Sequence, residues 1–400
     1  MITESFPSIN GRPVCGTPRI LFTTHCARLS GAEFILCDLV RDFFTNSQIF
    51  LFEDGPLRLH METTGLHVAV GHQLNHLLDI RRDGALTVDL PFLRAMSRAV
   101  LQLARMARKH QLVYANSQKA FAAAAFAAPL ARRPLVWHLH DIMTTEHFGA
   151  KQIRVAIGLA NRAAARVVVP SQAVADAFCA AGGQRNKVRV VPNGISIPAD
   201  TRLLDRYDLR AELGLPPGFL ISCVGRLAPW KGQHVMLEAL AALPDAQCII
   251  VGDPIFGERA YAEELHHLAD VLGLRDRVRF LGHRTDVPRL MRASDIVVHT
   301  SVDPEPSARV IVEAMLSGTP VAATSAGGVP EILTDGLGVL LYSPGNSTAL
   351  AKLLVSFQSG VYCKTRLVEE GIERAERFYS VRRMQRDVNS IILEILGAHQ

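Results

Sequence analysis

Short β-rich runs alternate with helix-like segments along almost the whole chain, and this alternation constrains the fold more than any other feature. In the first half the β-rich runs are Arg19–Thr24, Ile49–Glu53, His67–Val70, Leu112–Ala115, Leu135–Leu139, Arg166–Val169 and Val188–Val191. Helical patterns lie between many of them, as at residues 32–45, 92–110, 151–164 and 172–181. Strands that are separated by helices pair in parallel, so the alternation predicts an α/β fold with parallel sheets covered by helices.

The alternation stops once, in the Pro- and Gly-rich stretch VVPNGISIPADTRLLDRYDLRAELGLPPGF. A chain of 400 residues also exceeds the size of one ordinary core. We therefore expect two doubly wound, Rossmann-like domains facing a central cleft, at residues 19–196 and 197–380, after a flexible leader at residues 1–18. The final segment, 381–400, is expected to form a helix that crosses back to the first domain. In the second half the β-rich runs resume at 220–225, 247–251, 278–281, 296–300, 321–324 and 339–342.

The composition is that of an ordinary globular chain, with 48% hydrophobic and 20% charged residues. The seven cysteines are scattered and never form a C-x-x-C pair, which favours free thiols in a reducing cytoplasm over a zinc site. No apolar run approaches the roughly 20 residues of a membrane span. The leader is too polar for a signal peptide. These features predict a cytoplasmic protein.

Charge is distributed unevenly between the two halves. Residues 1–195 hold 22 Lys and Arg against 13 Asp and Glu, whereas the remaining residues hold 21 against 25. A basic half favours an anionic partner, such as a phospholipid surface, a lipid phosphate or an acidic saccharide. Nucleic acid is disfavoured as a partner, because no recognisable binding motif is present and aromatic residues make up only 6% of the chain.

The basic half contains an amphipathic helical pattern, FLRAMSRAVLQLARMARKH at residues 92–110. Its apolar stripe consists of Leu93, Met96, Val100, Leu103 and Ala107. Its basic stripe consists of Arg94, Arg98, Arg105 and Lys109. The pattern favours a core-facing helix with a solvated basic face. It leaves open a peripheral contact with anionic lipid at the inner face of the cytoplasmic membrane.

Two glutamates stand eight positions apart in the stretch DPEPSARVIVEAML. Pro306 biases Glu305 toward an extended conformation, so Glu305 lies outside any helix. Ser307 is a good N-cap, and a helix is expected over Ala308–Leu316, with Glu313 inside it. The helix N-terminus between the two carboxylates attracts anions. This arrangement suits a polyhydroxylated ligand that carries phosphate; the alternative is that both carboxylates are merely solvated.

Two cations follow a strand in the stretch LISCVGRLAPWKGQHVMLEAL, with Arg226 directly after the strand and Lys231 before a helix. Ligands of open α/β sheets bind beyond the carboxyl ends of strands, and two cations beside a helix N-terminus suit a diphosphate. The first domain opens similarly, with Ser30 and Gly31 before a helix, where glycine permits close backbone approach. The absence of a G-x-G-x-x-G motif weakens a dinucleotide-binding interpretation.

A histidine pair ends another strand, in LVWHLHDIMTTEHF. Side chains alternate along a strand, so His138 and His140 face the same side, and His140 lies nearer the strand end. The H-x-H-D pattern could also indicate a metal site, but no further ligands are spaced to complete it. We therefore expect no bound metal.

Together these stretches resemble the family 4 retaining glycosyltransferases of the GT-B fold, the bacterial group 1 glycosyltransferases. The resemblance rests on RLSGAE, HDIM, VVPNGI, GRLAPWKG, FLGHRTDVPRLMRASDIVVHTS and EPSARVIVEAMLSGTPVAATSAGGVPEIL. These stretches occur in family order over nearly the whole chain. The E-x7-E element combined with the G-R…K-G element is its most specific part.

The resemblance implies that the second domain holds a nucleotide-sugar donor. Arg226 and Lys231 would bind the donor diphosphate, with help from backbone N–H groups at Ser307 and Ala308. Glu313 would accept hydrogen bonds from the ribose. The family usually has an aromatic residue and a glycine where this chain has Ser307 and Ala308, so the resemblance leaves the donor-sugar preference open.

The resemblance also implies roles around the reacting sugar. Glu305 and His140 would contact the transferred sugar from the two domains. The nucleobase would lie near His283 and Arg284, and the Ser30–Gly31 loop would leave room for phosphate or acceptor.

The implied reaction is a metal-independent transfer with retention at the anomeric carbon and without a cofactor. The donor would be a UDP- or GDP-sugar. The acceptor would be a saccharide or a lipid-linked molecule in surface polysaccharide or glycolipid synthesis. The alternatives are a natural-product glycosyltransferase, a sugar-nucleotide epimerase and a catalytically silent nucleotide-sugar-binding subunit.

Overall fold

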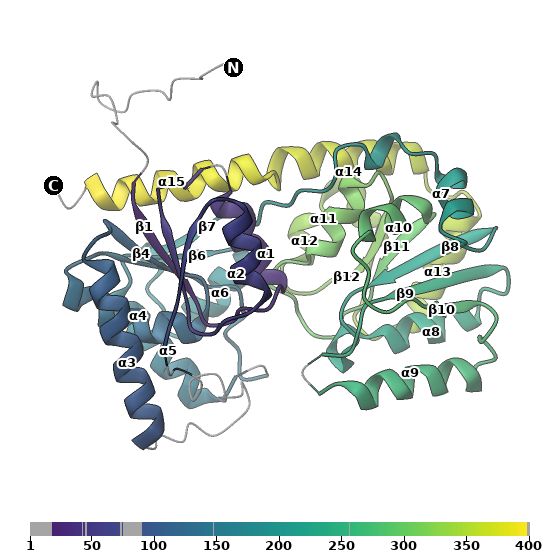
Figure 1. The fold of residues 1–400 in the computed structure, drawn as a ribbon. Helices are drawn as coiled ribbons and strands as arrows, with labels where there is room; N and C mark the ends of the chain where they lie inside the picture. Colours follow the sequence, from purple (N-terminus) through teal and green to yellow (C-terminus); the bar gives the residue numbers. More distant parts are fainter. Residues whose placement is uncertain are drawn as a thin grey trace, which may run out of the picture.

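The computed structural model describes residues 18–397, except residues 42, 45, 73, 75–89, 147 and 256. The chain forms two α/β domains that lie side by side, each built on a central parallel sheet (Figure 1). The predicted leader lies outside the described residues apart from its last position. The prediction of two doubly wound α/β domains is confirmed.

The N-terminal sheet is entirely parallel, in the order β3-β2-β1-β4-β5-β6-β7, with Ile20 of β1 opposite Leu112 of β4. Its strands are β1 Ile20–Thr24, β2 Gln48–Leu51, β3 His67–Val70, β4 Leu112–Ala115, β5 Leu135–His138, β6 Arg166–Val169 and β7 Val188–Val190. Its helices are α1 Gly31–Val40, α2 Pro56–Thr63, α3 Leu90–Ala107, α4 Gln118–Ala131, α5 Ala150–Ala163 and α6 Gln172–Ala180.

Side chains on the two faces of this sheet belong to different core clusters. Phe22 and Tyr114 pack on the side of α1 and α2, whereas Val113 and Trp137 pack on the side of α3 to α6. Both faces are therefore buried under helices, as parallel sheets require.

The C-terminal sheet is also parallel, in the order β10-β9-β8-β11-β12-β13, with Ile221 of β8 opposite Ile296 of β11. Its strands are β8 Phe219–Val224, β9 Ala246–Val251, β10 Val278–Phe280, β11 Ile296–His299, β12 Val321–Thr324 and β13 Leu341–Tyr342. Its helices are α7 Arg206–Glu212, α8 Gln233–Ala241, α9 Arg259–Val271, α10 Val287–Ala293, α11 Arg309–Leu316, α12 Val329–Ile332, α13 Ser347–Gln358 and α14 Lys364–Phe378.

Each sheet reverses its strand order at one point, between β1 and β4 in the first sheet and between β8 and β11 in the second. The loops that follow these paired strands lead away in opposite directions, and they leave room for a ligand at the carboxyl ends. The two reversal points are therefore the places where this fold positions a site.

The last helix, α15 (Val381–Gly397), lies against the N-terminal domain and contacts α1 (Figure 1, yellow). The side-chain amide of Gln385 donates to the carbonyl oxygens of Asp38 and Arg41, both at 2.8 Å. Further along the helix, Glu394 forms ion pairs with Arg166 and Arg189. Helix α15 is thus fixed to the first domain along its length.

A second contact joins the domains at Glu331 of α12. Its two carboxylate oxygens accept hydrogen bonds from the backbone N–H groups of Gln172 and Ala173, both at 2.8 Å. These N–H groups open helix α6 and have no partner within the helix, so a carboxylate from the other domain satisfies them.

Two local predictions are wrong. Helix α11 begins at Arg309 with Ala308 as its N-cap, because the backbone stays extended through Ala308 (φ −82°, ψ 93°) and the Ser307 side chain caps nothing.

In α3, Leu93 is 48% exposed instead of facing the core. The buried face consists of Ala95, Ala99, Leu103, Ala104 and Ala107. Small side chains occupy it because the alanine-rich helix α4 packs closely against it.

Candidate active site

The loop after β8 brings the predicted cations to the reversal point of the C-terminal sheet. It ends in a tight turn at Gly232, whose φ of +67° suits glycine. A Cβ atom at Gly232 would lie 2.2 Å from the carbonyl oxygen of Thr300, at the end of β11. The Thr300 hydroxyl donates to the carbonyl oxygen of Lys231 at 2.7 Å. Lys231 is therefore fixed beside the loop that follows β11.

Glu305 lies in that second loop and is 6% exposed. Its Oε1 accepts hydrogen bonds from Lys231 Nζ and His299 Nε2, each at 2.7 Å, and from the Ser301 hydroxyl. The other nitrogen of His299, Nδ1, lies 3.3 Å from the hydroxyl of Thr324. Burial alone would raise the pKa of the Glu305 carboxyl, but the Lys231 charge and the His299 contact outweigh it and hold that pKa well below its usual range. Glu305 is an ionised, immobilised carboxylate.

The backbone of Glu305 is held by the glycine pair before α12. Its carbonyl oxygen accepts a hydrogen bond from the N–H of Gly328 at 2.8 Å. A Cβ atom at Gly327, whose φ is +59°, would lie 2.3 Å from the same oxygen. The G-G pair of the stretch SAGGVPEIL thus lets two loops approach closely and aims the carboxylate.

Arg226 and Lys231, the residues predicted to bind the diphosphate, both lie beside the indole ring of Trp230. The Arg226 guanidinium carbon lies 5.4 Å from the Trp230 ring centroid, and Lys231 Nζ lies 4.4 Å from it. Arg226 also pairs with Glu258 at 3.2 Å. Burial raises the pKa of Glu258, and the nearby Arg226 partly offsets this. Both cations are therefore oriented by carboxylates and by an aromatic face before any ligand binds.

Glu313 lies inside α11, as predicted, and its carboxylate accepts a hydrogen bond from Arg309 Nη2 at 3.0 Å. Arg309 also reaches toward the other domain. Its Nη1 lies 3.8 Å from Asp38 Oδ2, and its guanidinium stacks on Phe34 at 5.4 Å. Glu313, the residue predicted to bind the ribose, thus lies at the boundary between the domains.

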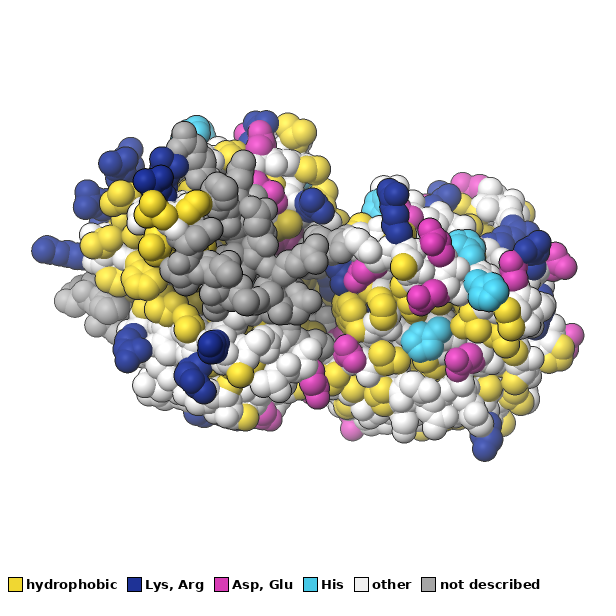
Figure 2. All heavy atoms as spheres, turned by 90° about the horizontal axis from the view of Figure 1, so that it is seen from below, with side chains coloured by type: hydrophobic (Ala, Val, Ile, Leu, Met, Phe, Trp, Pro, Cys, Tyr) yellow, Lys and Arg dark blue, Asp and Glu magenta, His cyan; other side chains and the backbone are white. Residues whose placement is uncertain are grey.

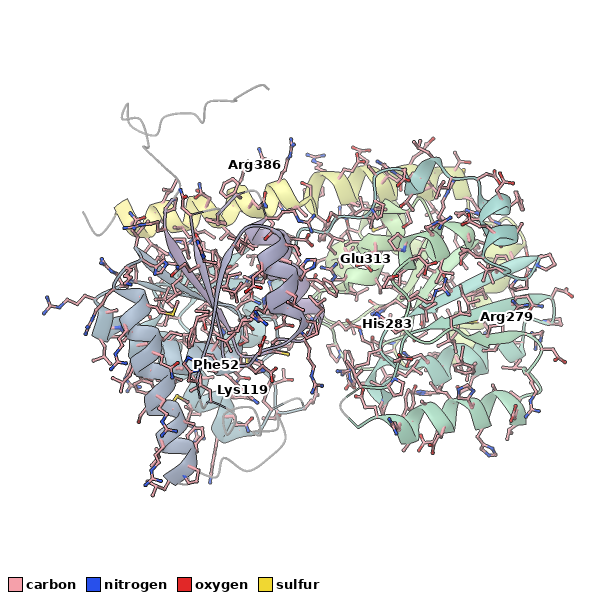
Figure 3. The ribbon with its side chains drawn as sticks, viewed as in Figure 1. Phe52, Lys119, Arg279, His283, Glu313 and Arg386 are labelled. Atoms are coloured by element: carbon pink, nitrogen blue, oxygen red, sulfur yellow. The ribbon has the colours of Figure 1, made fainter. Side chains whose placement is uncertain are left out.

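The predicted nucleobase residues follow β10. Arg284 is held in place by Asp286, which accepts from Nε at 2.8 Å and from Nη2 at 2.7 Å. His283 is exposed, and Figure 3 places it with Glu313 on the side that faces the N-terminal domain. Ala308, before α11, has an ordinary negative φ, so alanine fits there without backbone strain.

His140 follows β5 at the carboxyl edge of the N-terminal sheet. Its Nε2 lies 3.0 Å from Asn116 Oδ1, and the Asn116 amide nitrogen donates to the carbonyl oxygen of Ala32 at 3.0 Å. Burial lowers the pKa of His140 to about 4. The ring is neutral at pH 7, with its proton on Nε2 and a lone pair on Nδ1. His138 faces the same side, with the two ring centroids 3.9 Å apart.

The Ser30–Gly31 loop begins α1 beside β1. The Ser30 hydroxyl donates to Glu33, and the Thr24 hydroxyl donates to the other Glu33 oxygen at 3.3 Å. Glu33 is 3% exposed, and burial raises its pKa. A Cβ atom at Gly31 would meet no protein atom within 4 Å, so the start of α1 is open to a ligand.

Sequence reasoning missed four polar residues of the site: Glu33, Asn116, His299 and Ser301. Three of them carry the signal that identified Arg226, since Asn116 directly follows β4, His299 ends β11 and Ser301 lies two residues beyond it. Glu33 is an acid in the first turn of α1. Acidic residues are common at that position because it favours negative charge, so the sequence gives no signal that Glu33 belongs to a site.

The structure brings Lys231 and Glu305 into direct contact and places His140 and the Ser30–Gly31 loop on the other domain. Among the described residues, no group of three or more His, Cys, Asp or Glu side chains is arranged to hold a metal ion. The same part of the chain contains no helix that is both long and apolar enough to cross a membrane.

Comparison with known proteins identifies the class. Residues 205–373 match the family Glycosyl transferases group 1, and residues 58–194 match the Glycosyl transferase 4-like domain. The structure is similar to Anabaena HepE, solved with UDP and with UDP-glucose, at a TM-score of 0.81 and 36% identity over 94% of this chain and 100% of that chain. A glycosyltransferase from Rickettsia africae shares the fold, with a TM-score of 0.78 at 19% identity over 96% of this chain and 99% of that chain.

Curated relatives include a D-inositol 3-phosphate glycosyltransferase of Mycolicibacterium gilvum, which is 40% identical over 161 residues. That match covers 39% of this chain and 36% of the relative, so it spans little more than a third of the relative's length.

Two parallel α/β domains with polar clusters at both reversal points define a protein of the GT-B fold. The chain belongs to the group 1 glycosyl transferases.

Proposed function

We propose that this protein transfers a sugar from a UDP-sugar to a saccharide or lipid-linked acceptor, with retention at the anomeric carbon. The observation that carries the proposal is the cluster of Lys231 and Glu305 at the reversal point of the second sheet, with Arg226 beside it. The sequence left UDP and GDP open as nucleotides. HepE, a relative over almost the whole chain, was solved with UDP and UDP-glucose, which supports UDP.

The donor would lie along the carboxyl edge of the second sheet. Arg226 and Lys231 would bind the diphosphate, and the free N–H groups that precede α11, at Ser307 and Ala308, would add donors of their own. Glu313 would accept hydrogen bonds from the ribose. This order fits the chain, because Glu313 lies deeper in α11 than the residues assigned to the phosphates.

The nucleobase would lie at the loop of His283 and Arg284. Asp286 occupies the Arg284 guanidinium through two hydrogen bonds. Base recognition would therefore use the backbone of this loop and not the Arg284 side chain.

Glu305 would orient the transferred sugar. Its Oε1 already accepts from Lys231, His299 and Ser301, so Oε2 is the oxygen left for a sugar hydroxyl. A carboxylate held by three donors loses little entropy on binding and can position the anomeric carbon. The carboxylate is also a poor nucleophile toward the anomeric carbon, because its negative charge is already shared with Lys231. We therefore assign Glu305 to positioning the reacting sugar and not to forming a covalent intermediate.

The proposed chemistry is a front-face substitution. The acceptor hydroxyl oxygen forms a bond to the anomeric carbon while the bond from that carbon to the diphosphate oxygen breaks. The hydroxyl proton moves to the departing diphosphate. The cations at Arg226 and Lys231 stabilise the negative charge that develops there, so the step is proposed to need neither a metal ion nor a cofactor.

The N-terminal domain would present the acceptor. Neutral His140, with its Nδ1 lone pair, can accept a hydrogen bond from a hydroxyl of the donor sugar. The open start of α1 at Gly31 gives room for the acceptor. One relative is named for inositol 3-phosphate, an anionic acceptor, and the basic N-terminal half would suit such a molecule.

We place the reaction in the cytoplasm, in surface polysaccharide or glycolipid synthesis. A lipid-linked acceptor would require peripheral contact with the inner face of the cytoplasmic membrane. The excess of Lys and Arg in residues 1–195 supports such contact with anionic lipid.

The proposal is tested by incubating the protein with UDP- and GDP-sugars and measuring both thermal stabilisation and release of free nucleotide. We expect one UDP-sugar to raise the melting temperature and to be hydrolysed slowly without acceptor. An Arg226→Ala variant serves as the matched control for site binding. Stabilisation by GDP-sugars alone would overturn the assignment of UDP as the nucleotide. Binding of a nucleotide sugar without any release of nucleotide, even when cell extracts that contain acceptors are added, would favour a catalytically silent subunit.

A further inference from the structure

Helices α3, α4 and α5 form a layer on one face of the N-terminal sheet and carry no acidic residue. Residues 90–163 contain eleven Lys and Arg but only two Asp and Glu, and both acids lie between β5 and α5. The three helices themselves carry seven cations. Surface helices ordinarily mix both charge signs, so a whole layer of one sign indicates a partner of the opposite sign.

The outer side of α3 combines these cations with exposed leucines. Residues at spacings of three or four share one side of a helix. They are Leu90, Arg94, Arg98, Leu101 and Arg105, and all five are exposed. Leu101 is 52% exposed in the middle of this stripe. Apolar and cationic side chains therefore occupy the same surface, not opposite faces of the helix.

The neighbouring helices extend this surface. Helix α4 packs between α3 and α5, and it exposes Phe126 and Leu130 by 52% and 56%. Helix α5 adds Arg154 and the exposed Val155. In Figure 2, dark blue and yellow side chains gather at the left edge of the N-terminal domain.

Folding does not explain this surface. Small residues on the opposite side of α3 already form its contact with α4. Within the described part of the chain, no ion pair is found for Arg94, Arg98 or Arg105. In contrast, helix α9 of the other domain carries both charge signs, since it exposes Glu263, Glu264 and Asp270 beside Arg259.

We propose that the outer side of α3, α4 and α5 is a docking surface for an anionic lipid bilayer. Arginines interspersed with leucines and a phenylalanine suit a helix layer that rests at the boundary of headgroups and acyl chains. A second copy of this chain fits poorly, because symmetric pairing would oppose seven cations to seven. The proposal rests on the proposed function only in that the bilayer would carry the lipid-linked acceptor.

The three α3 arginines provide the sharpest test. Each cation near an anionic surface contributes about 1 kcal/mol, so removing three should cost about 3 kcal/mol. Since about 1.4 kcal/mol corresponds to a factor of ten, this is roughly a 100-fold weaker partition onto vesicles.

The experiment is sedimentation of the full chain with phosphatidylglycerol-containing vesicles and with neutral phosphatidylcholine vesicles. We expect binding to the anionic vesicles only, and loss of binding as salt rises from about 0.1 M to 1 M, where the Debye length falls from about 10 to 3 Å. The variant Arg94→Gln/Arg98→Gln/Arg105→Gln should bind roughly 100-fold more weakly. Leu90→Ser/Leu101→Ser should also weaken binding while leaving the net charge unchanged.

The matched control removes three exposed cations elsewhere, in Lys352→Gln/Arg382→Gln/Arg386→Gln. Figure 3 labels Arg386 on α15, which packs on the other side of the domain from α3. The control should bind like the wild type. If the control and the α3 variant lost vesicle binding equally, net charge alone would explain the binding and the proposal would be overturned. Wild-type binding by the α3 variant, absence of binding to anionic vesicles, or self-association abolished by the α3 substitutions would also overturn it.

Nucleotide release from UDP-sugars in vesicle-free solution separates this proposal from the proposed function. The α3 variant should retain that release, because none of its substituted residues lies in the donor site. If release is absent from the wild type but vesicle binding follows the expected pattern, only the catalytic proposal fails.

Discussion

Replacing Lys231 with methionine should destabilise the C-terminal domain, because it leaves Glu305 buried without its cationic partner. The two side chains are 18% and 8% exposed and lie 2.7 Å apart. Breaking a buried pair by removing one partner costs about 3–5 kcal/mol. His299 and Ser301 still donate to Glu305 in the variant, so we expect the lower end, about 3 kcal/mol, or roughly 6–12 °C in the melting temperature of that domain.

The cost should depend on pH, and its sign follows from the Glu305 pKa. In the wild type that pKa lies below its unfolded value, so the carboxylate stabilises the fold above the unfolded pKa and loses this contribution as the pH falls. Without Lys231 the effect of burial prevails and the pKa rises. The ionised carboxylate then destabilises the variant at neutral pH. The difference between the two proteins should therefore be largest near pH 7 and shrink toward pH 4.

The assay is thermal and urea unfolding at several pH values, with Lys231→Met/Glu305→Gln as the companion variant. The amide of glutamine can keep an oxygen toward His299 without carrying charge. We expect the double variant to recover most of the lost stability. A double variant as unstable as the single one, or a loss that is the same at every pH, would refute the assignment of Lys231 and Glu305 as a coupled buried pair.

Three further results are expected. Arg226→Ala should weaken UDP by roughly 1.5–3 kcal/mol, about 10- to 150-fold, in calorimetry and nearly abolish transfer; wild-type affinity would remove Arg226 from the diphosphate site. Transfer should survive EDTA, because Arg226 and Lys231 are assigned to the leaving diphosphate; a complete loss that Mg²⁺ reverses would contradict this assignment. The pKa of His140 is lowered to about 4, so between about pH 6.5 and 4 the unfolded chain takes up its proton first and stability falls by about 1.4 kcal/mol per pH unit. His140→Gln should reduce the measured slope by about this amount in urea titrations, while buried His138, whose pKa is also lowered, keeps its own contribution. An unchanged slope would show that His140 does not titrate in this way.

The sequence predicted the fold well because both sheets are buried on both faces. Strands such as β6 and β12 then read as short apolar runs, and the loops between them are rich in Gly and Pro. Local rules failed where neighbours decided the outcome. Ser307 has the side chain of an N-cap, yet the chain stays extended for one more residue.

The composition of the site was partly predictable, but its pairings were not. Strand-end positions identified Arg226, Lys231 and His140. The contact of Lys231 with Glu305 joins residues 74 positions apart, and it depends on β8 and β11 being neighbours across the reversal in strand order. The contact of Glu331 with helix α6 depends on how the two domains pack. A local sequence pattern does not determine which strands become neighbours or how the two domains pack.

The division of labour between the two glutamates is the central claim, and calorimetry with free UDP tests it most directly. We expect Glu313→Gln to weaken UDP, because Glu313 is assigned to the ribose. We expect Glu305→Gln to leave UDP affinity largely intact and to lower turnover, because its contact is with the transferred sugar near the reacting carbon. Loss of UDP affinity in Glu305→Gln together with unchanged affinity in Glu313→Gln would contradict the account.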